Sequence, residues 1–192
     1  MFGRYHHRKP PHHYTQLSDE VGNFLMRLAL TDLYRARWTG MIHDEWIRNV
    51  LRQRLDLKAE DLERTRSLMD AHARDSLVTG FERLIPSIEL PDADDRHVLA
   101  AAIQSGASLI ITFNLKDFPP EQLNRYQVSA QHPDDFIFDL LDQHLARMCE
   151  AAANHRRSLK NPPKTADEYL DTLLKRGLTQ TVGVLRGWRA AI

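Results

Sequence analysis

The sequence predicts an α/β protein in which helices alternate with short strands of a buried parallel sheet. Amphipathic helical stripes recur between residues 18 and 106, with apolar side chains three and four positions apart. A glycine turn then leads into the compact apolar run Leu109–Thr112, which is typical of a parallel strand covered on both faces. A second short strand candidate, Val128–Ala130, precedes another helical stretch. This alternation indicates an α/β layer.

The helices expected before the apolar run cover residues 18–34, 40–54, 58–73 and 94–106. Gly106 is a natural end for the last of them, because glycine readily adopts the left-handed conformation that ends helices. Residues 76–81 form a further short strand candidate.

The C-terminal part is predicted to be helical. A helix is expected over residues 133–144, and a proline-rich linker ends at Thr165, which has capping-box spacing to Glu168. Two more helices follow and form a helical hairpin that ends near Trp188. We therefore divide the chain into a basic arm rich in histidine and proline (1–17), an α/β domain (18–145) and a C-terminal helical extension (146–192).

The formal net charge is zero, from 26 basic and 26 acidic side chains, which argues against a polycation that coats nucleic acid. The charges are unevenly distributed, however: residues 17–150 carry 15 basic and 23 acidic side chains, and both flanks are basic. One interpretation is a soluble domain with solvated tails. The other is an acidic pocket that collects metal ions, rimmed by cations that hold a polyanion through its phosphates.

Cys149 is the single cysteine, which excludes an intrachain disulfide and a cysteine-rich zinc site. No apolar run approaches the roughly 18 to 20 residues that a membrane span needs. We therefore expect a cytoplasmic protein without a membrane segment.

The helix that ends at Gly106 carries the first candidate metal ligand, Asp95. Helical periodicity places this carboxylate at the head of the buried stripe, where an unpaired charge is costly. Asp92, Asp94 and Asp95 could simply cap the helix, although capping needs only one of them. The alternative is that Asp95, with or without Asp94, binds a divalent cation.

Further oxygen ligands follow the predicted strand, since ligands in open α/β sheets lie beyond the carboxyl ends of the strands. Thr112, Asn114 and Asp117 stand in this loop and suit a hard cation such as Mg²⁺, or else form a solvent-facing turn. Glu45, on the helix over 40–54, is a weaker candidate that depends on a fold bringing it near Asp95.

Three segments together resemble the PIN domain of VapC-type toxin ribonucleases. They are Pro91–Ala102, Ile110–Phe118 and, for the second acid of the family, Trp38–Trp46. The resemblance covers about residues 22–140, and the C-terminal hairpin is similar to the extension of one PIN subgroup. It implies a three-layer α/β/α sandwich with a small parallel sheet.

The resemblance also implies a metal-dependent endoribonuclease that cleaves single-stranded RNA with water activated by Mg²⁺ or Mn²⁺. By position in the motifs, Glu45, Asp95 and Asp117 match the catalytic acids. Asp94 and Asn114 are further metal-ligand candidates, and Thr112 is a loop hydroxyl on the substrate side. The implied partners are a small antitoxin protein and a second copy of the chain in a homodimer. Arg156, Arg157 and Lys160 are candidates for holding RNA phosphates.

The sequence departs from the family pattern near its start. A PIN domain begins with an apolar strand that ends in an aspartate, but residues 7–16 contain two prolines, no apolar run and no acid. His12 or His13 stands nearest the expected aspartate. Three explanations are open: a shifted reading frame or misassigned start, a degenerate relative, or a histidine in place of the acid. The alternative function is a catalytically impaired domain that binds RNA or an antitoxin.

Overall fold

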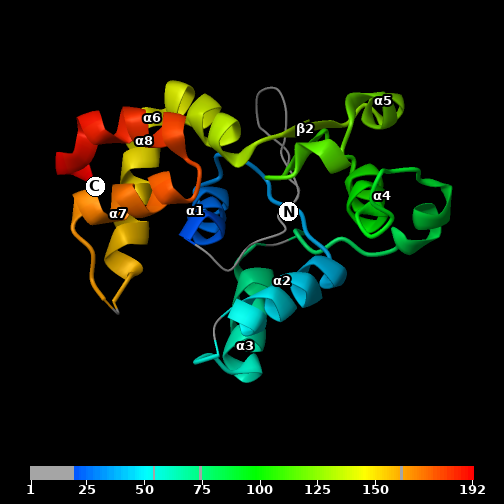
Figure 1. The fold of residues 1–192 in the computed structure, drawn as a ribbon, viewed down its shortest axis with the longest axis horizontal. Helices are drawn as coiled ribbons and strands as arrows, with labels where there is room; N and C mark the ends of the chain where they lie inside the picture. The colour runs from blue at the N-terminus through cyan, green and yellow to red at the C-terminus, as the bar shows by residue number, and fades with distance from the viewer. Residues whose placement is uncertain (1–19, 54, 74, 161) are drawn as a thin grey trace. The chain divides into compact units, whose positions relative to one another are not determined.

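The computed structural model describes residues 20–53, 55–73, 75–160 and 162–192 (Figure 1). The predicted arm, including His12 and His13, lies outside the described residues. The chain divides into two compact units, and each is taken by itself below. The described part of the first unit is residues 34–132, and the second combines residues 20–33 with 133–192. The two units divide the chain after Leu33 and after His132. The predicted domain boundaries lie elsewhere, after residues 17 and 145, and they stay a prediction.

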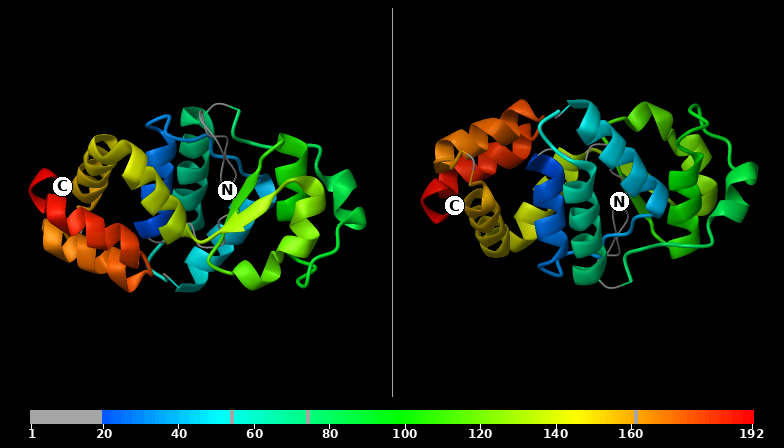
Figure 2. Two further views of the ribbon diagram at one scale, coloured as in Figure 1. Left: turned by 90° about the horizontal axis from the view of Figure 1, so that it is seen from above. Right: turned by 90° about the horizontal axis from the view of Figure 1, so that it is seen from below.

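The first unit contains a small parallel sheet. Strand β1 (Leu109–Ile111) is buried throughout and pairs in parallel with β2 (Ser129–Gln131), with Ile110 opposite Ala130. Figure 2 shows the two strands side by side. The α/β class and the parallel pairing are therefore confirmed.

The strand predicted over residues 76–81 is wrong, because the segment contains a single β-bridge and no strand. Only Leu77 forms a bridge, in parallel with Trp38. Gly80 then takes a φ of +74°, a left-handed conformation that interrupts an extended chain. A 3-10 helix, η1 (Glu82–Ser87), follows directly.

Helix α4 (Arg96–Ser105) packs against β1 and η1. It ends as predicted at Gly106, which has a φ of 62° and donates its N–H to the carbonyls of Ala102 and Ile103. It begins two residues later than predicted, because the Asp92 side chain accepts the N–H of Asp94 at 2.8 Å and holds the preceding segment in a turn. Short helices join β1 to β2: η2 (Leu115–Asp117), α5 (Pro120–Leu123) and η3 (Asn124–Tyr126).

Helices α2 (Gly40–Gln53) and α3 (Ala59–His72) are joined by a polar network in the core. The indole N–H of Trp46 donates to Nδ1 of His43 at 2.9 Å. Because indole is only a donor, the His43 proton lies on Nε2 and is directed at Asp70, 3.1 Å away. The Trp38 indole donates to the same Asp70 oxygen at 2.7 Å. This network holds α2, and with it Glu45, in one position.

The second unit is helical. It contains α1 (Glu20–Ala29), α6 (Pro133–Ser158), α7 (Ala166–Lys175), α8 (Thr179–Leu185) and the 3-10 helix η4 (Arg186–Ala191). Helix α6 packs against α1 and α8, and α7 packs against α8. The predicted capping box is present: Thr165 and Glu168 accept each other's backbone N–H groups.

The predicted helix end at His144 is a kink inside a longer helix. His144 has non-helical angles (φ −139°, ψ 37°), after which α6 continues to Ser158. The first turn of α6 carries the buried Asp134, whose two oxygens accept the N–H groups of Gln180 and Thr181 at 2.8 and 2.9 Å. This carboxylate caps α8 and ties it to α6. Among the described residues, no helix combines the length and the apolar character needed to cross a membrane.

Candidate metal centre

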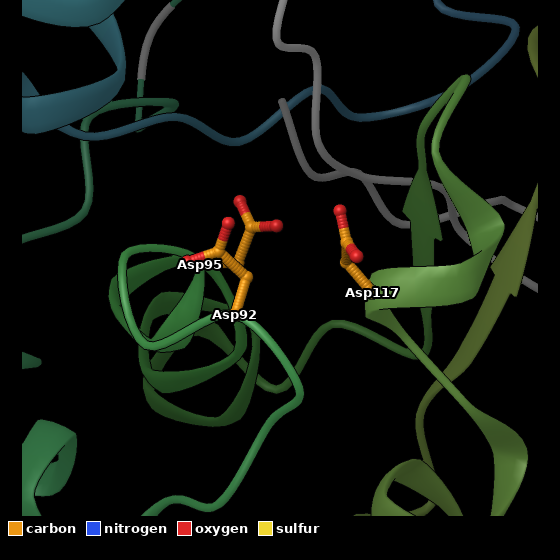
Figure 3. A group of neighbouring side chains, drawn as sticks. All are labelled: Asp92, Asp95 and Asp117. Atoms are coloured by element: carbon orange, nitrogen blue, oxygen red, sulfur yellow. The ribbon is translucent and has the colours of Figure 1, made fainter.

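Asp92, Asp95 and Asp117 bring their carboxylates together in the first unit (Figure 3). One oxygen from each lies within 4.8 Å of the others. Asp92 stands in the turn before α4, Asp95 is the N-cap residue of α4, and Asp117 ends η2, just beyond β1. The cluster thus forms where the loop after β1 meets the start of α4.

The loop after β1 is held by its own polar side chains. The N–H of Thr112 donates to Gln131, which extends the β1–β2 ladder by one bond. The Thr112 hydroxyl accepts the N–H of Asn114 at 3.0 Å. The Asn114 amide in turn donates to the Asp117 carboxylate. These bonds fix the direction of Asp117, so that Thr112 and Asn114 support the site from within the loop.

The capping interpretation fails for Asp95. Its side chain makes no cap hydrogen bond, and the capping bond in this turn comes from Asp92. Asp94 is exposed and lines the same pocket, but it is not part of the three-carboxylate cluster. Asp92, which sequence reasoning considered only as a cap, does belong to it.

The cluster opens into a pocket of about 830 Å³. The structure places all the candidate acids on its wall, together with Thr112 and Asn114. Their role as ligands stays a prediction. The lining residues are Met41, Asp44, Glu45, Arg48, Asp92, Asp94, Asp95, His97, Thr112, Phe113, Asn114 and Asp117.

The electrostatics of the pocket favour a bound cation. Burial, followed by the charges of Asp117 and Asp92, raises the pKa of Asp95 to about 7. Burial also raises the pKa of Glu45; the charge of Arg48 lowers it, and the weaker contributions of Asp94 and Asp92 raise it. Like charges held this close are unfavourable without a counter-ion, and such shifts mark functional sites. A divalent cation would remove the repulsion.

The donor set fits a hard metal ion. Carboxylate oxygens from Asp92, Asp95 and Asp117 converge, with a hydroxyl and an amide in the adjoining loop. Oxygen ligands of this kind suit Mg²⁺ and Mn²⁺. Among the described residues no cysteine lines the pocket, and the histidine that does, His97, has its pKa lowered to about 4 by burial.

Glu45 and His97 face each other across the pocket wall. Glu45 Oε2 on α2 lies 4.0 Å from His97 Nε2 on α4. Glu45 is partly buried and His97 is 8% exposed. Sequence reasoning treated His97 as an ordinary helix residue, and its position two residues after Asp95 was the only available signal.

The predicted phosphate-binding cations belong to the second unit. Arg156 donates through Nε to the carbonyl of Ile192 and through Nη1 to that of Lys164, at 3.0 and 2.9 Å, and so supports the fold. Arg157 donates to Asn154 in the same helix, and Lys160 is exposed. Their contact with RNA stays a prediction. Among the described residues, Arg48, three residues after Glu45, is a cation that lines the pocket, and sequence reasoning missed it.

Comparisons with known proteins support the resemblance described above. Residues 133–187 match the family described as "VapC50 C-terminal domain". A Mycobacterium tuberculosis (strain ATCC 25618 / H37Rv) protein named "Putative ribonuclease VapC50" is 43% identical over 79 residues. The matches confirm the resemblance to the VapC-type family.

The coverage of these matches is partial. The aligned part spans 41% of this chain and 47% of the M. tuberculosis protein, so about half of that relative is matched. The family match begins at Pro133, where the second unit resumes, and it contains none of the pocket-lining residues. No solved structure matches the chain significantly. The pocket is therefore identified as a candidate metal site by its geometry alone.

Proposed function

We propose that the protein is a metal-dependent endoribonuclease of the VapC type, which cleaves single-stranded RNA at the acidic pocket. The observation that carries this proposal is the convergence of Asp92, Asp95 and Asp117 within 4.8 Å at a strongly acidic site. The name of the M. tuberculosis relative supports the choice of reaction. Asp95, Asp117 and Glu45 are the residues we place in the catalytic machinery, and Asp92 joins them.

In this mechanism the carboxylates hold one or two Mg²⁺ or Mn²⁺ ions. A bound ion supplies a water of lowered pKa and stabilises charge on the phosphate. Asp92, Asp95 and Asp117 balance the charge of the ions and fix their place. Asn114 keeps Asp117 directed into the cluster through its amide hydrogen bond. No side-chain nucleophile or histidine base is required.

The remaining pocket has room for part of an RNA chain. Its volume of about 830 Å³ is far more than an ion occupies. Arg48 offers a guanidinium to a phosphate oxygen, and Phe113, which lines the same pocket, offers a ring for a base. The substrate contacts are therefore proposed on the pocket wall, with Thr112 as a neighbouring hydroxyl.

The proposal includes partners that follow from the family. A small antitoxin protein would place an Arg or Lys side chain among the carboxylates, where charge-assisted hydrogen bonds are strong. We also propose a homodimer in the cytoplasm. The competing function is an impaired domain that binds RNA or antitoxin without cutting.

The test is cleavage of single-stranded RNA by the purified protein with Mn²⁺, with and without a chelator. Asp95→Asn removes a carboxylate from the cluster, and Asp142→Asn is the matched control because Asp142 is exposed on α6 outside the pocket. We expect at least about a 100-fold loss in Asp95→Asn and none in the control. Equal activity in wild type and Asp95→Asn would contradict the site. RNA binding without cleavage by wild type would favour the impaired domain.

A further inference from the structure

Glu45 lines the same pocket as the three clustered aspartates but is not part of their cluster. Asp92 and Asp117 are each held by a hydrogen bond, to the N–H of Asp94 and to the Asn114 amide. No hydrogen bond to the Glu45 carboxylate is found among the described residues, and its Oε2 lies 4.0 Å from His97 Nε2. A ligand that is free to rotate loses conformational entropy on binding a metal.

His97 is a costly residue at its position. It is 8% exposed and lies in the first turn of α4, beside the buried Val98, Leu99 and Ala100. Its Nδ1 is buried and has no hydrogen-bond partner among the described residues. Burying an imidazole in an apolar stripe without partners is unfavourable. Among the described residues, the ion pair found for the ring is with Glu45, 4.0 Å from Nε2.

The arrangement also indicates where the imidazole carries its proton. Buried N–H groups without an acceptor are rarer than acceptors without a donor. A proton on Nδ1 would leave a buried donor unpaired, whereas a proton on Nε2 faces the Glu45 carboxylate. A rotation of the Glu45 side chain, which is 28% exposed, would shorten the 4.0 Å contact to a hydrogen bond.

We propose that His97 is a positioning residue, which donates a hydrogen bond from Nε2 to Glu45 and holds that carboxylate toward the metal cluster. This inference rests on the proposed function, because Glu45 serves as a ligand only if the pocket binds a metal. Partners that orient metal ligands typically contribute 10- to 100-fold to metal affinity.

Two substitutions separate this role from simple packing. His97→Gln places an amide N–H near the position of Nε2, and His97→Asn places one near the position of Nδ1. Both bury a neutral amide, so a purely structural role would make them similar. We expect Mn²⁺ affinity, measured by calorimetry, to fall about 10-fold in His97→Asn and less than about 3-fold in His97→Gln.

The Glu45→Gln background completes the test as a double-mutant cycle. There, His97→Asn should cost no further affinity, since the hydrogen bond no longer serves a charged ligand. A loss in His97→Asn of the same size in both backgrounds, or equal affinities in wild type and His97→Asn, would overturn the inference while leaving the proposed function intact. Wild-type protein that binds no Mn²⁺ would contradict the proposed function itself, and this inference with it.

A measurement on the unaltered protein covers the case in which the variants fold poorly. The ¹⁵N chemical shifts of the His97 ring report which nitrogen carries the proton. We expect protonation at Nε2, and a proton on Nδ1 would overturn the inference.

Discussion

Asp134 in the second unit and the aspartate cluster in the first unit show two opposite uses of charge. In the second unit, buried or partly buried charges are matched by the fold: Asp134 accepts two backbone N–H groups, and Arg156 donates to two carbonyls. In the first unit, Asp92, Asp95 and Asp117 crowd together, and the pKa of Asp95 rises to about 7. A charged group that is hydrogen-bonded within the protein stabilises the fold. Like charges held close together without a counter-ion instead indicate a binding site for a cation.

The largest effect on stability is expected at Asp134. Asp134→Ala removes the acceptor of two N–H groups, that of Gln180 in a partly buried bond and that of Thr181, which is fully buried. We expect the free energy of unfolding to fall by about 2 to 3 kcal/mol. Urea denaturation followed by circular dichroism measures this change.

The control for this prediction is Asp142→Ala, on the exposed face of the same helix. It should change the free energy of unfolding by less than about 0.5 kcal/mol. If Asp134→Ala were no more destabilising than the control, the contrast between the two units would be lost.

In metal-free protein, a substitution at Asp95 is expected to raise the free energy of unfolding, the opposite of the effect at Asp134. Its folded pKa, about 7, lies above the usual value of 3.8, so the ionised carboxylate destabilises the folded state above neutral pH. Asp95→Asn should therefore raise the free energy of unfolding by about 1 to 2 kcal/mol near pH 8, after allowance for solvent screening. The gain should shrink as the pH falls from about 7 toward 4, because wild type then takes up the proton.

Denaturation of both proteins with a chelator, at several pH values, tests this prediction. A destabilised Asp95→Asn protein near pH 8 would show that the aspartate is satisfied within the fold, like Asp134.

The smallest change is expected in the kinetics of a variant at Arg48, a cation that lines the pocket. Arg48→Gln removes a charge that we propose contacts a substrate phosphate. We expect KM for single-stranded RNA to rise about 3- to 10-fold, with kcat nearly unchanged and a weaker dependence on salt. Steady-state kinetics at two salt concentrations provide the measurement. A fall in kcat with unchanged KM would remove Arg48 from substrate binding.

Much of the fold followed from local signals in the sequence. The buried strand at Leu109, the helix end at Gly106 and the capping box at Thr165 each depend on a few neighbouring residues. The segment after Leu77 was misjudged as a strand, since Gly80 takes a left-handed conformation and a 3-10 helix begins at Glu82. The continuation of α6 past His144 depends on packing against α1 and α8, which local periodicity does not report.

The site was predicted in part. Asp95 and Asp117 carried recognisable sequence contexts, and the structure brings them together. Asp92 was taken for a helix cap, and it does accept the N–H of Asp94. Its membership of the cluster depends on Asp117, far along the chain, so only tertiary structure shows it. His97 and Arg48 were missed for the same reason.

The measurement that tests the central claim most directly is a calorimetric titration of wild-type protein with Mn²⁺ at two pH values. The metal must displace the proton from Asp95, whose pKa is about 7. We predict saturable binding near pH 8 that weakens about 10-fold near pH 6, and a marked loss of binding in Asp95→Asn. No saturable binding near pH 8, or binding that Asp95→Asn leaves unchanged, would contradict the claim that these aspartates form a metal site.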